Sequence, residues 1–252
     1  MIFIKRLIPY FSAGLVILSL EWSLNYYLNW QFWVIALLLN VVLTVLFLNK
    51  FRLNKETFGF MVSPVCFLLS SLAFLYFQEA VIWQQAIIFG GSLLYWLFIN
   101  NISNFLYQSK SYLPYSLESV SNYLNLVAIF FTYITCFSFF ILTVSRLRWL
   151  IILIFLVTLL LTWQSMWINK IHQRFNFFIF VLPVVITEMY WALHYWPTSF
   201  FVCGFILTLI YYIFTTFVKL HHLENLNKKN VIRHLALSSL ILIIVLSTTT
   251  WA

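Results

Sequence analysis

Two acidic residues inside apolar stretches are the side chains of this sequence best suited to chemistry. Glu188 follows Arg174 by about fourteen residues, and Glu21 follows Arg6 by about fifteen, each within a largely apolar run. At about 1.5 Å of rise per residue, both carboxyls would lie roughly 21–22 Å along a helix, inside a hydrocarbon core of roughly 30 Å. A carboxylate in lipid is costly, so such residues usually pair, become protonated or face an interior. The two glutamates therefore mark the candidate functional site.

Three interpretations of the two glutamates follow from this cost. In the first, they are protonated or hydrogen-bonded residues that hold helices together, with Asn25 on the turn after Glu21. In the second, they form ion pairs with Arg146 or Arg148 at the outer ends of the helices. In the third, they line an outward-facing cavity that binds a cation, a proton or a polar head group. The sequence leaves these alternatives open.

His194 extends the candidate polar site, because it lies at the expected outer end of the segment that carries Glu188. It follows Glu188 by about six residues and so does not share its helical face. An acid–base pair would have to form across helices, between His194 and Glu21. The sequence contains no aspartate and no HExxH motif, which excludes aspartyl intramembrane proteases and zincin-type sites. We expect neither a cofactor nor a metal.

The composition is that of a membrane protein. Hydrophobic residues make up 63% of the 252 residues and charged residues only 8%, too few to cover the surface of a soluble domain. The apolar stretches recur along the whole chain, which predicts a single integral membrane domain over residues 1–252. The net charge of +8 comes in small groups between apolar runs, which is typical of a topology signal and not of nucleic-acid binding.

The apolar segments predict an all-α, polytopic transmembrane helix bundle of about nine helices, since a span needs roughly 20 residues. An interfacial position of the last segment would leave eight spans, but its apolar run from Leu240 to Leu246 favours nine. The connection Asn100–Tyr123 is expected to be an interfacial segment. The predicted spans are Leu7–Tyr27, Trp30–Leu48, Phe58–Tyr76, Val81–Ile99, Leu124–Val144, Trp149–Ile168, Phe175–Leu193, Ser199–Val218 and Val231–Thr249.

The basic residues predict the orientation of the bundle. With the N-terminus in the cytoplasm, all but two of the 14 lysines and arginines fall on the inner side, and only Arg146 and Arg148 fall outside. The positive-inside rule therefore predicts an N-in, C-out protein of the inner (cytoplasmic) membrane, whose inner connections touch anionic lipid. The inner residues are Lys5, Arg6, Lys50, Arg52, Lys55, Lys110, Lys170, Arg174, Lys219, Lys228, Lys229 and Arg233.

The segment around Glu188 also resembles a recurring sequence pattern. Glu188-Met-Tyr-Trp191-Ala-Leu193-His-Tyr-Trp-Pro197 is similar to a Glu-x-x-Trp-x-Leu-x-x-x-Pro segment of uncharacterised multi-pass bacterial membrane proteins. A weaker similarity to the pattern occurs at Glu21. Such a family has no known function, so the resemblance implies only that the Glu188 region is its distinguishing segment.

Two functional classes fit these observations. The first is a non-enzymatic membrane component, either an assembly partner or a small-solute or ion conduit, with a polar site in the outer half of the bilayer. The second is a membrane enzyme acting on a lipid-linked substrate at the outer leaflet, with a glutamate as general base and Arg146 or Arg148 as a head-group clamp. We favour the first class, because the glutamates fit no catalytic pattern. The expected partners are the lipid bilayer, anionic lipid at the cytoplasmic face and a protein in the membrane, but no nucleic acid.

Overall fold

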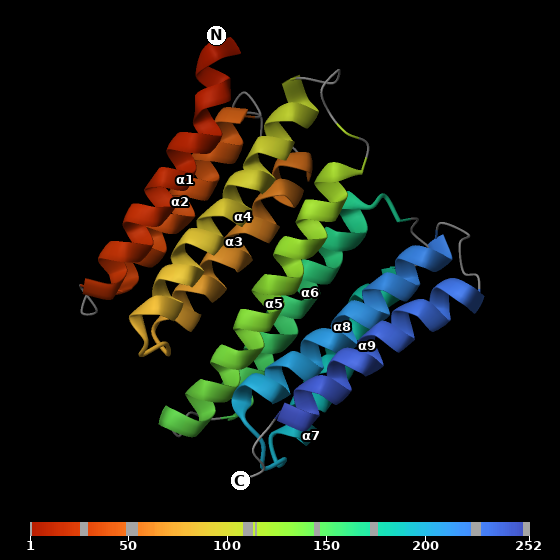
Figure 1. Cartoon of the computed structure of the whole chain (residues 1–252). Helices are drawn as coiled ribbons and strands as arrows, with labels where there is room; N and C mark the ends of the chain where they lie inside the picture. Colours follow the sequence, from red (N-terminus) through yellow and green to blue (C-terminus); the bar gives the residue numbers. More distant parts are fainter. Residues whose placement is uncertain are drawn as a thin grey trace. The chain divides into compact units, whose positions relative to one another are not determined.

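The computed structural model consists of helices and short connections throughout the part that it describes (Figure 1). This part comprises residues 2–25, 30–48, 55–107, 113, 115–143, 147–171, 176–222 and 228–248. The predicted all-α fold of about nine helices is confirmed. The helices of the described part are α1 (Ile2–Asn25), α2 (Trp30–Leu48), α3 (Lys55–Leu75), α4 (Val81–Tyr107), α5 (Ser116–Thr143), α6 (Leu147–Ile168), α7 (Asn176–Leu193), α8 (Phe200–His222) and α9 (Lys228–Thr248).

Most of these helices have the length and apolar character that a membrane span requires. Eight helices of the described part are long and apolar enough to cross a membrane. The last segment, α9, is among them, with an apolar run over Lys228–Ser247. The exception is α7, whose apolar part over Phe177–Leu193 is shorter. The helices thus fit a membrane protein, and the shortest apolar helix is the one that carries Glu188.

The helices on both sides of the connection between α4 and α5 extend beyond the predicted spans, and an interfacial position of this segment stays a prediction. Helix α4 continues to Tyr107 and α5 begins at Ser116, so most of the expected interfacial segment Asn100–Tyr123 is helical. Polar side chains support these extensions. The Asn101 side-chain amide donates to the carbonyl oxygen of Leu97 at 2.8 Å, and the Ser116 hydroxyl donates to Asn101 Oδ1 at 2.9 Å. Asparagine and serine, which favour loops when alone, here satisfy hydrogen bonds within and between helix ends.

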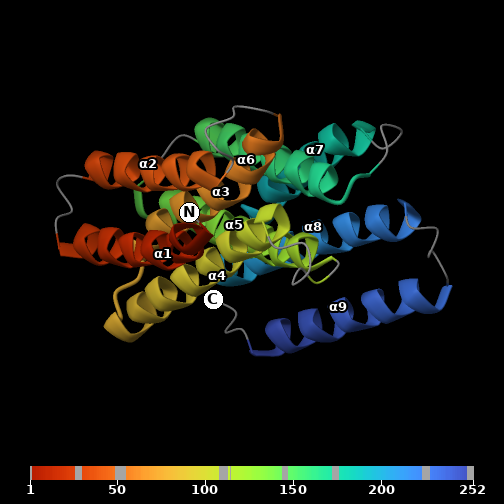
Figure 2. The same cartoon turned by 90° about the horizontal axis from the view of Figure 1, so that it is seen from above.

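The chain forms two compact units, Met1–Ala128 and Ile129–Ala252, whose boundary falls inside α5. In the first unit, α1 packs against α2 and α4, and α3 also packs against both of these helices. In the second unit, α7 packs against α6 and α8, and α9 packs on α8, as Figure 2 shows. That the two units together make one integral membrane domain stays a prediction.

Polar side chains join helices within the first unit. The Asn40 side-chain amide in α2 donates to the carbonyl oxygen of Ser12 in α1 at 3.0 Å, and within α2 the Thr44 hydroxyl donates to the carbonyl oxygen of Asn40 at 2.6 Å. The hydroxyl of Ser63 in α3 donates to Asn125 Oδ1 in α5, and both residues are buried. Such bonds matter in a bilayer, because lipid tails give apolar helices no hydrophobic reason to associate.

The second unit is joined by a close helix approach and by tyrosine hydroxyls. A Cβ atom added at Gly204 in α8 would lie 2.6 Å from Ile134 Cγ1 and 3.1 Å from the Ile134 backbone nitrogen in α5, so a larger residue does not fit. The Tyr133 hydroxyl lies 3.0 Å from the Thr158 hydroxyl in α6. Since Thr158 donates its only proton to the carbonyl oxygen of Ile154 at 2.7 Å, Tyr133 is the donor to Thr158.

Candidate functional site

Helix α7 turns one face toward the interior of the second unit. Leu182, Ile186 and Tyr190 are buried and recur at the spacing of a single helical face. The Tyr190 hydroxyl donates to the carbonyl oxygen of Cys136 at 3.3 Å, and its ring centroid lies 4.5 Å from that of Phe137. These contacts to α5 determine how α7 is rotated, and therefore where Glu188 points.

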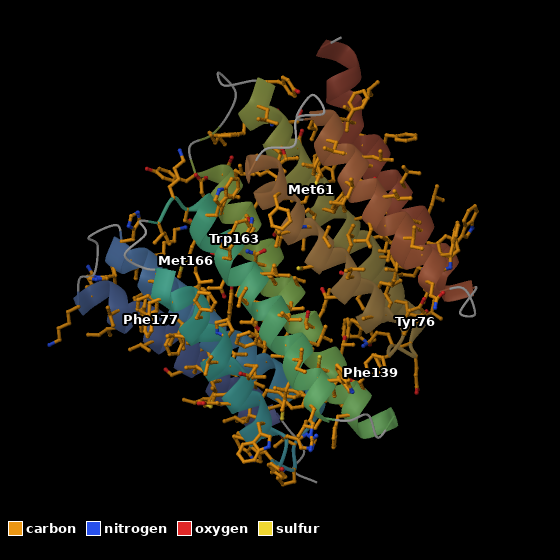
Figure 3. All side chains as sticks on the ribbon, turned by 180° about the vertical axis from the view of Figure 1, so that it is seen from behind. Met61, Tyr76, Phe139, Trp163, Met166 and Phe177 are labelled. Carbon is orange, nitrogen blue, oxygen red and sulfur yellow. The ribbon has the colours of Figure 1, made fainter. Side chains whose placement is uncertain are left out.

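Glu188 lies on the exposed side of α7. The exposed residues Phe177, Phe180, Val184, Glu188 and Trp191 recur every three or four positions, and we call this set the Glu188 face. Figure 3 labels Phe177, its first member. Val184 is 44% exposed and Trp191 53% exposed, one turn before and one turn after the carboxylate. Glu188 is therefore a charged residue on an outward surface that is otherwise apolar.

Arg148 lies in the first turn of α6 and is exposed, beside the exposed Trp149. Helix α7 follows α6 after a short connection and packs along it, so the two helices run antiparallel. The start of α6 and the end of α7 consequently lie at the same end of the second unit. Within the described residues, no ion pair joins Arg148 to Glu188. Arg146, the other candidate cation, lies outside the described residues.

His194 lies among aromatic rings in the turn after α7. Its ring is edge-on to Phe140 with 3.8 Å between centroids, and 5.4 Å from the ring of Tyr195. Burial lowers the pKa of His194, because the charged imidazolium loses solvation there. In the part of the chain that the structure describes, no hydrogen bond links His194 to Glu188. The packing makes His194 a neutral aromatic contact at this end of the unit.

Glu21 lies near the end of α1, in the first unit, and is half-buried. The neighbouring Trp22 is exposed, and its ring centroid lies 6.1 Å from that of Trp33 in α2. The side chain of Asn25 falls outside the described side chains. Glu21 and Glu188 belong to different units, so their convergence in one polar site stays a prediction.

A sequence comparison assigns the chain to a family. Residues 47–248 match the family described as Protein of unknown function (DUF5656), about four fifths of the 252 residues. The chain belongs to the DUF5656 family. The predicted membership of an uncharacterised family is thereby confirmed. No curated protein and no solved structure matches the chain.

The DUF5656 match separates the candidate residues into two groups. Arg148, Glu188 and His194 lie within the matched residues, whereas Glu21 precedes them. No group of three or more His, Cys, Asp or Glu side chains that could hold a metal occurs among the described residues. Where the structure places it, Glu188 can accept hydrogen bonds or pair with a cation that approaches α7 from outside.

Sequence reasoning missed the direction in which Glu188 points. The depth of a charged residue can be read from its distance to the end of an apolar run. The direction of its side chain can be read only where one face of the helix is polar and the other apolar. Both faces of α7 are apolar, since Leu182 and Ile186 lie on one and Phe180 and Val184 on the other. The aromatic residues beside Glu188 indicated its level, because tryptophan and tyrosine favour the head-group region, but they did not indicate its direction.

Proposed function

We propose that this DUF5656 protein is a non-enzymatic integral membrane component that assembles with a membrane-embedded protein through the Glu188 face. The observation that supports this is the exposed carboxylate among exposed apolar side chains. A charged side chain in the hydrocarbon is costly, by about 2.5–3.5 kcal/mol at the bilayer centre and by less toward the head groups, and glutamate reaches less far toward water than lysine and arginine do. A protein partner that donates hydrogen bonds to Glu188 removes this cost.

The aromatic residues after Glu188 support a position in the outer half of the membrane. Trp191 and Tyr195 are both exposed, one and two turns beyond Glu188. Tryptophan and tyrosine favour the head-group level, which supports a position of the carboxylate just inside that level. The proposed location is the inner (cytoplasmic) membrane with the N-terminus inside, an orientation supported by the distribution of lysine and arginine.

The exposure of Glu188 also favours assembly over the competing activities. An ion or solute conduit, and an enzyme acting on a lipid-linked substrate, would both need Glu188 in an enclosed polar site. The carboxylate instead has apolar neighbours on an outward surface, and neither Arg148 nor His194 bonds to it within the described part. Assembly is the function that uses a carboxylate in this position.

The proposal is tested by site-specific photo-crosslinking in native membranes. A photoreactive residue at Val184 should form a protein adduct, because the Glu188 face is covered by protein. The matched control is Ile243 in α9, which is 64% exposed on a helix that packs only weakly, and should form lipid adducts. The Glu188→Leu variant should lose most of the Val184 protein adduct while retaining its yield. Lipid adducts alone at Val184 would refute the proposal.

A further inference from the structure

The second unit carries both members of a charge pair that do not meet within one chain. Arg148 and Glu188 are exposed on packed, antiparallel helices, near the same end of the unit. Figures 2 and 3 agree that α6 and α7 lie side by side. Glu188 and Arg148 carry opposite charges on neighbouring helices, and within the described residues neither has an ion-pair partner. Two copies of the unit could therefore pair these charges reciprocally.

A two-fold axis along the membrane normal would bring these charges together. Such an axis keeps every residue at its own depth, so Glu188 can meet only groups near its level. Glu188 precedes the end of α7 by roughly 8 Å at about 1.5 Å per residue, while Arg148 lies in the first turn of α6. The arginine side chain is long enough to cover about one helical turn, so the pair forms only if the guanidinium turns from the outer end of α6 toward the carboxylate, a cost that the arginine–carboxylate bond has to offset.

The apolar side chains around the two charges complete the surface. Ile152, Leu153 and Leu156 are exposed along α6, and Phe180 and Val184 along α7. In a two-fold contact each of these residues is used twice, once from each subunit, so a modest patch provides a continuous apolar seam. The arginine–carboxylate pairs at the outer end of this seam would set its register, since such pairs are directional and often bidentate.

Resting on the proposed function, we propose that the molecule covering the Glu188 face is a second copy of this chain. In the two-fold dimer, Glu188 of each subunit pairs with the partner subunit's Arg148. The choice of a second copy rests on charge complementarity. Glu188 requires a cation, and Arg148 on the neighbouring helix supplies one. A different membrane protein would have to supply both charges in the same arrangement.

The dimer is tested by co-capture of two differently tagged copies from mildly solubilised membranes. Glu188→Arg in both copies places arginine opposite arginine, and Arg148→Glu in both copies places glutamate opposite glutamate. Each should lower co-capture at least about tenfold, the effect of about 1.4 kcal/mol. Coexpression of one E188R copy with one R148E copy restores both ion pairs and should return co-capture to the wild-type level. Glu79→Arg, in the exposed connection after α3, is the matched charge control and should change nothing.

The outcomes separate this inference from the proposed function. Undiminished co-capture of the E188R copies, or a mixed pair that stays apart although each variant is produced at normal yield, would overturn the dimer. A Val184 adduct with a different protein and no second copy would also overturn the dimer, while leaving assembly through the Glu188 face intact. Lipid adducts alone would overturn both.

Discussion

Side-chain hydrogen bonds join helices in both units of this chain, and the second unit adds a close approach of two helices. In Met1–Ala128, side-chain amides and hydroxyls bond across helices, as between Ser63 and Asn125. In Ile129–Ala252, α8 approaches α5 closely at Gly204, and the hydroxyl of Tyr133 bonds to Thr158. In lipid, neither unit gains from burying apolar surface, so specificity has to come from hydrogen bonds or close packing. Both units should therefore respond to lost polarity, and the second should also respond to added volume at Gly204.

The largest effect is expected from Gly204→Ala. The new Cβ would lie 2.6 Å from Ile134 Cγ1 and 3.3 Å from Ile134 Cα, so the backbone of α5 would have to move. Overpacking of this kind typically costs about 1–3 kcal/mol. We expect a clearly lower melting temperature of the purified protein in detergent, measured by tryptophan fluorescence.

Gly90→Ala in α4 is the matched control for this substitution. A Cβ atom at Gly90 would meet nothing within 4 Å, and alanine favours a helix over glycine by roughly 1 kcal/mol. The melting temperature of this variant should be unchanged or slightly raised. Equal losses for both glycine substitutions would contradict the close approach of α5 and α8.

The next effect concerns the hydrogen bonds, and it is measured by a double-mutant cycle in each unit. Ser63→Ala and Asn125→Ala remove the two partners of a buried bond between α3 and α5. We expect a coupling energy of about 0.6–1.7 kcal/mol, the range of interhelical hydrogen bonds in membrane proteins. Thermal unfolding of the two single variants and the double variant gives this value.

The matching cycle in the second unit combines Tyr133→Phe with Thr158→Val. Its coupling should lie in the same range, about 0.6–1.7 kcal/mol, because Thr158→Val alone leaves the buried Tyr133 hydroxyl without its acceptor, a cost that Tyr133→Phe removes in the double variant. Tyr133→Phe alone should cost less, since Thr158 keeps its bond to the carbonyl oxygen of Ile154. A coupling near zero would show that the bond between Tyr133 and Thr158 does not stabilise the second unit.

The sequence was sufficient for the helices and insufficient for their contacts. Runs of about 20 apolar residues are visible without a structure, and each of the nine predicted segments is a helix in the described part. The polar and small residues that join the helices, such as Asn125 and Gly204, are visible too, but their partners lie far away in sequence. The depth of Glu188 was readable, whereas its direction depended on Tyr190 and its contact with Cys136.

The smallest effect in the comparison is a dependence on pH that only the second unit should show. All 5 histidines of the sequence lie in Ile129–Ala252, and among those that the structure describes, His194 is the one whose pKa is lowered by burial. In the unfolded chain its pKa is near the ordinary value of about 6.5. Between the two pKa values the unfolded state binds more protons, so stability rises with pH in that window. The contribution of the neutral ring is present above about pH 6.5 and is lost as the pH falls through the folded pKa.

His194→Phe isolates this contribution, because phenylalanine keeps an aromatic ring against Phe140 and cannot take up a proton. The melting temperature of the wild-type protein should fall when the pH is lowered from about 7 to about 5, and that of the variant should fall less. Gly204→Ala should keep the wild-type slope, since it changes packing between α5 and α8 and leaves His194 in place. If wild type and His194→Phe shared one slope, the pH response would belong to other groups, and the ring of His194 would contribute by its shape alone.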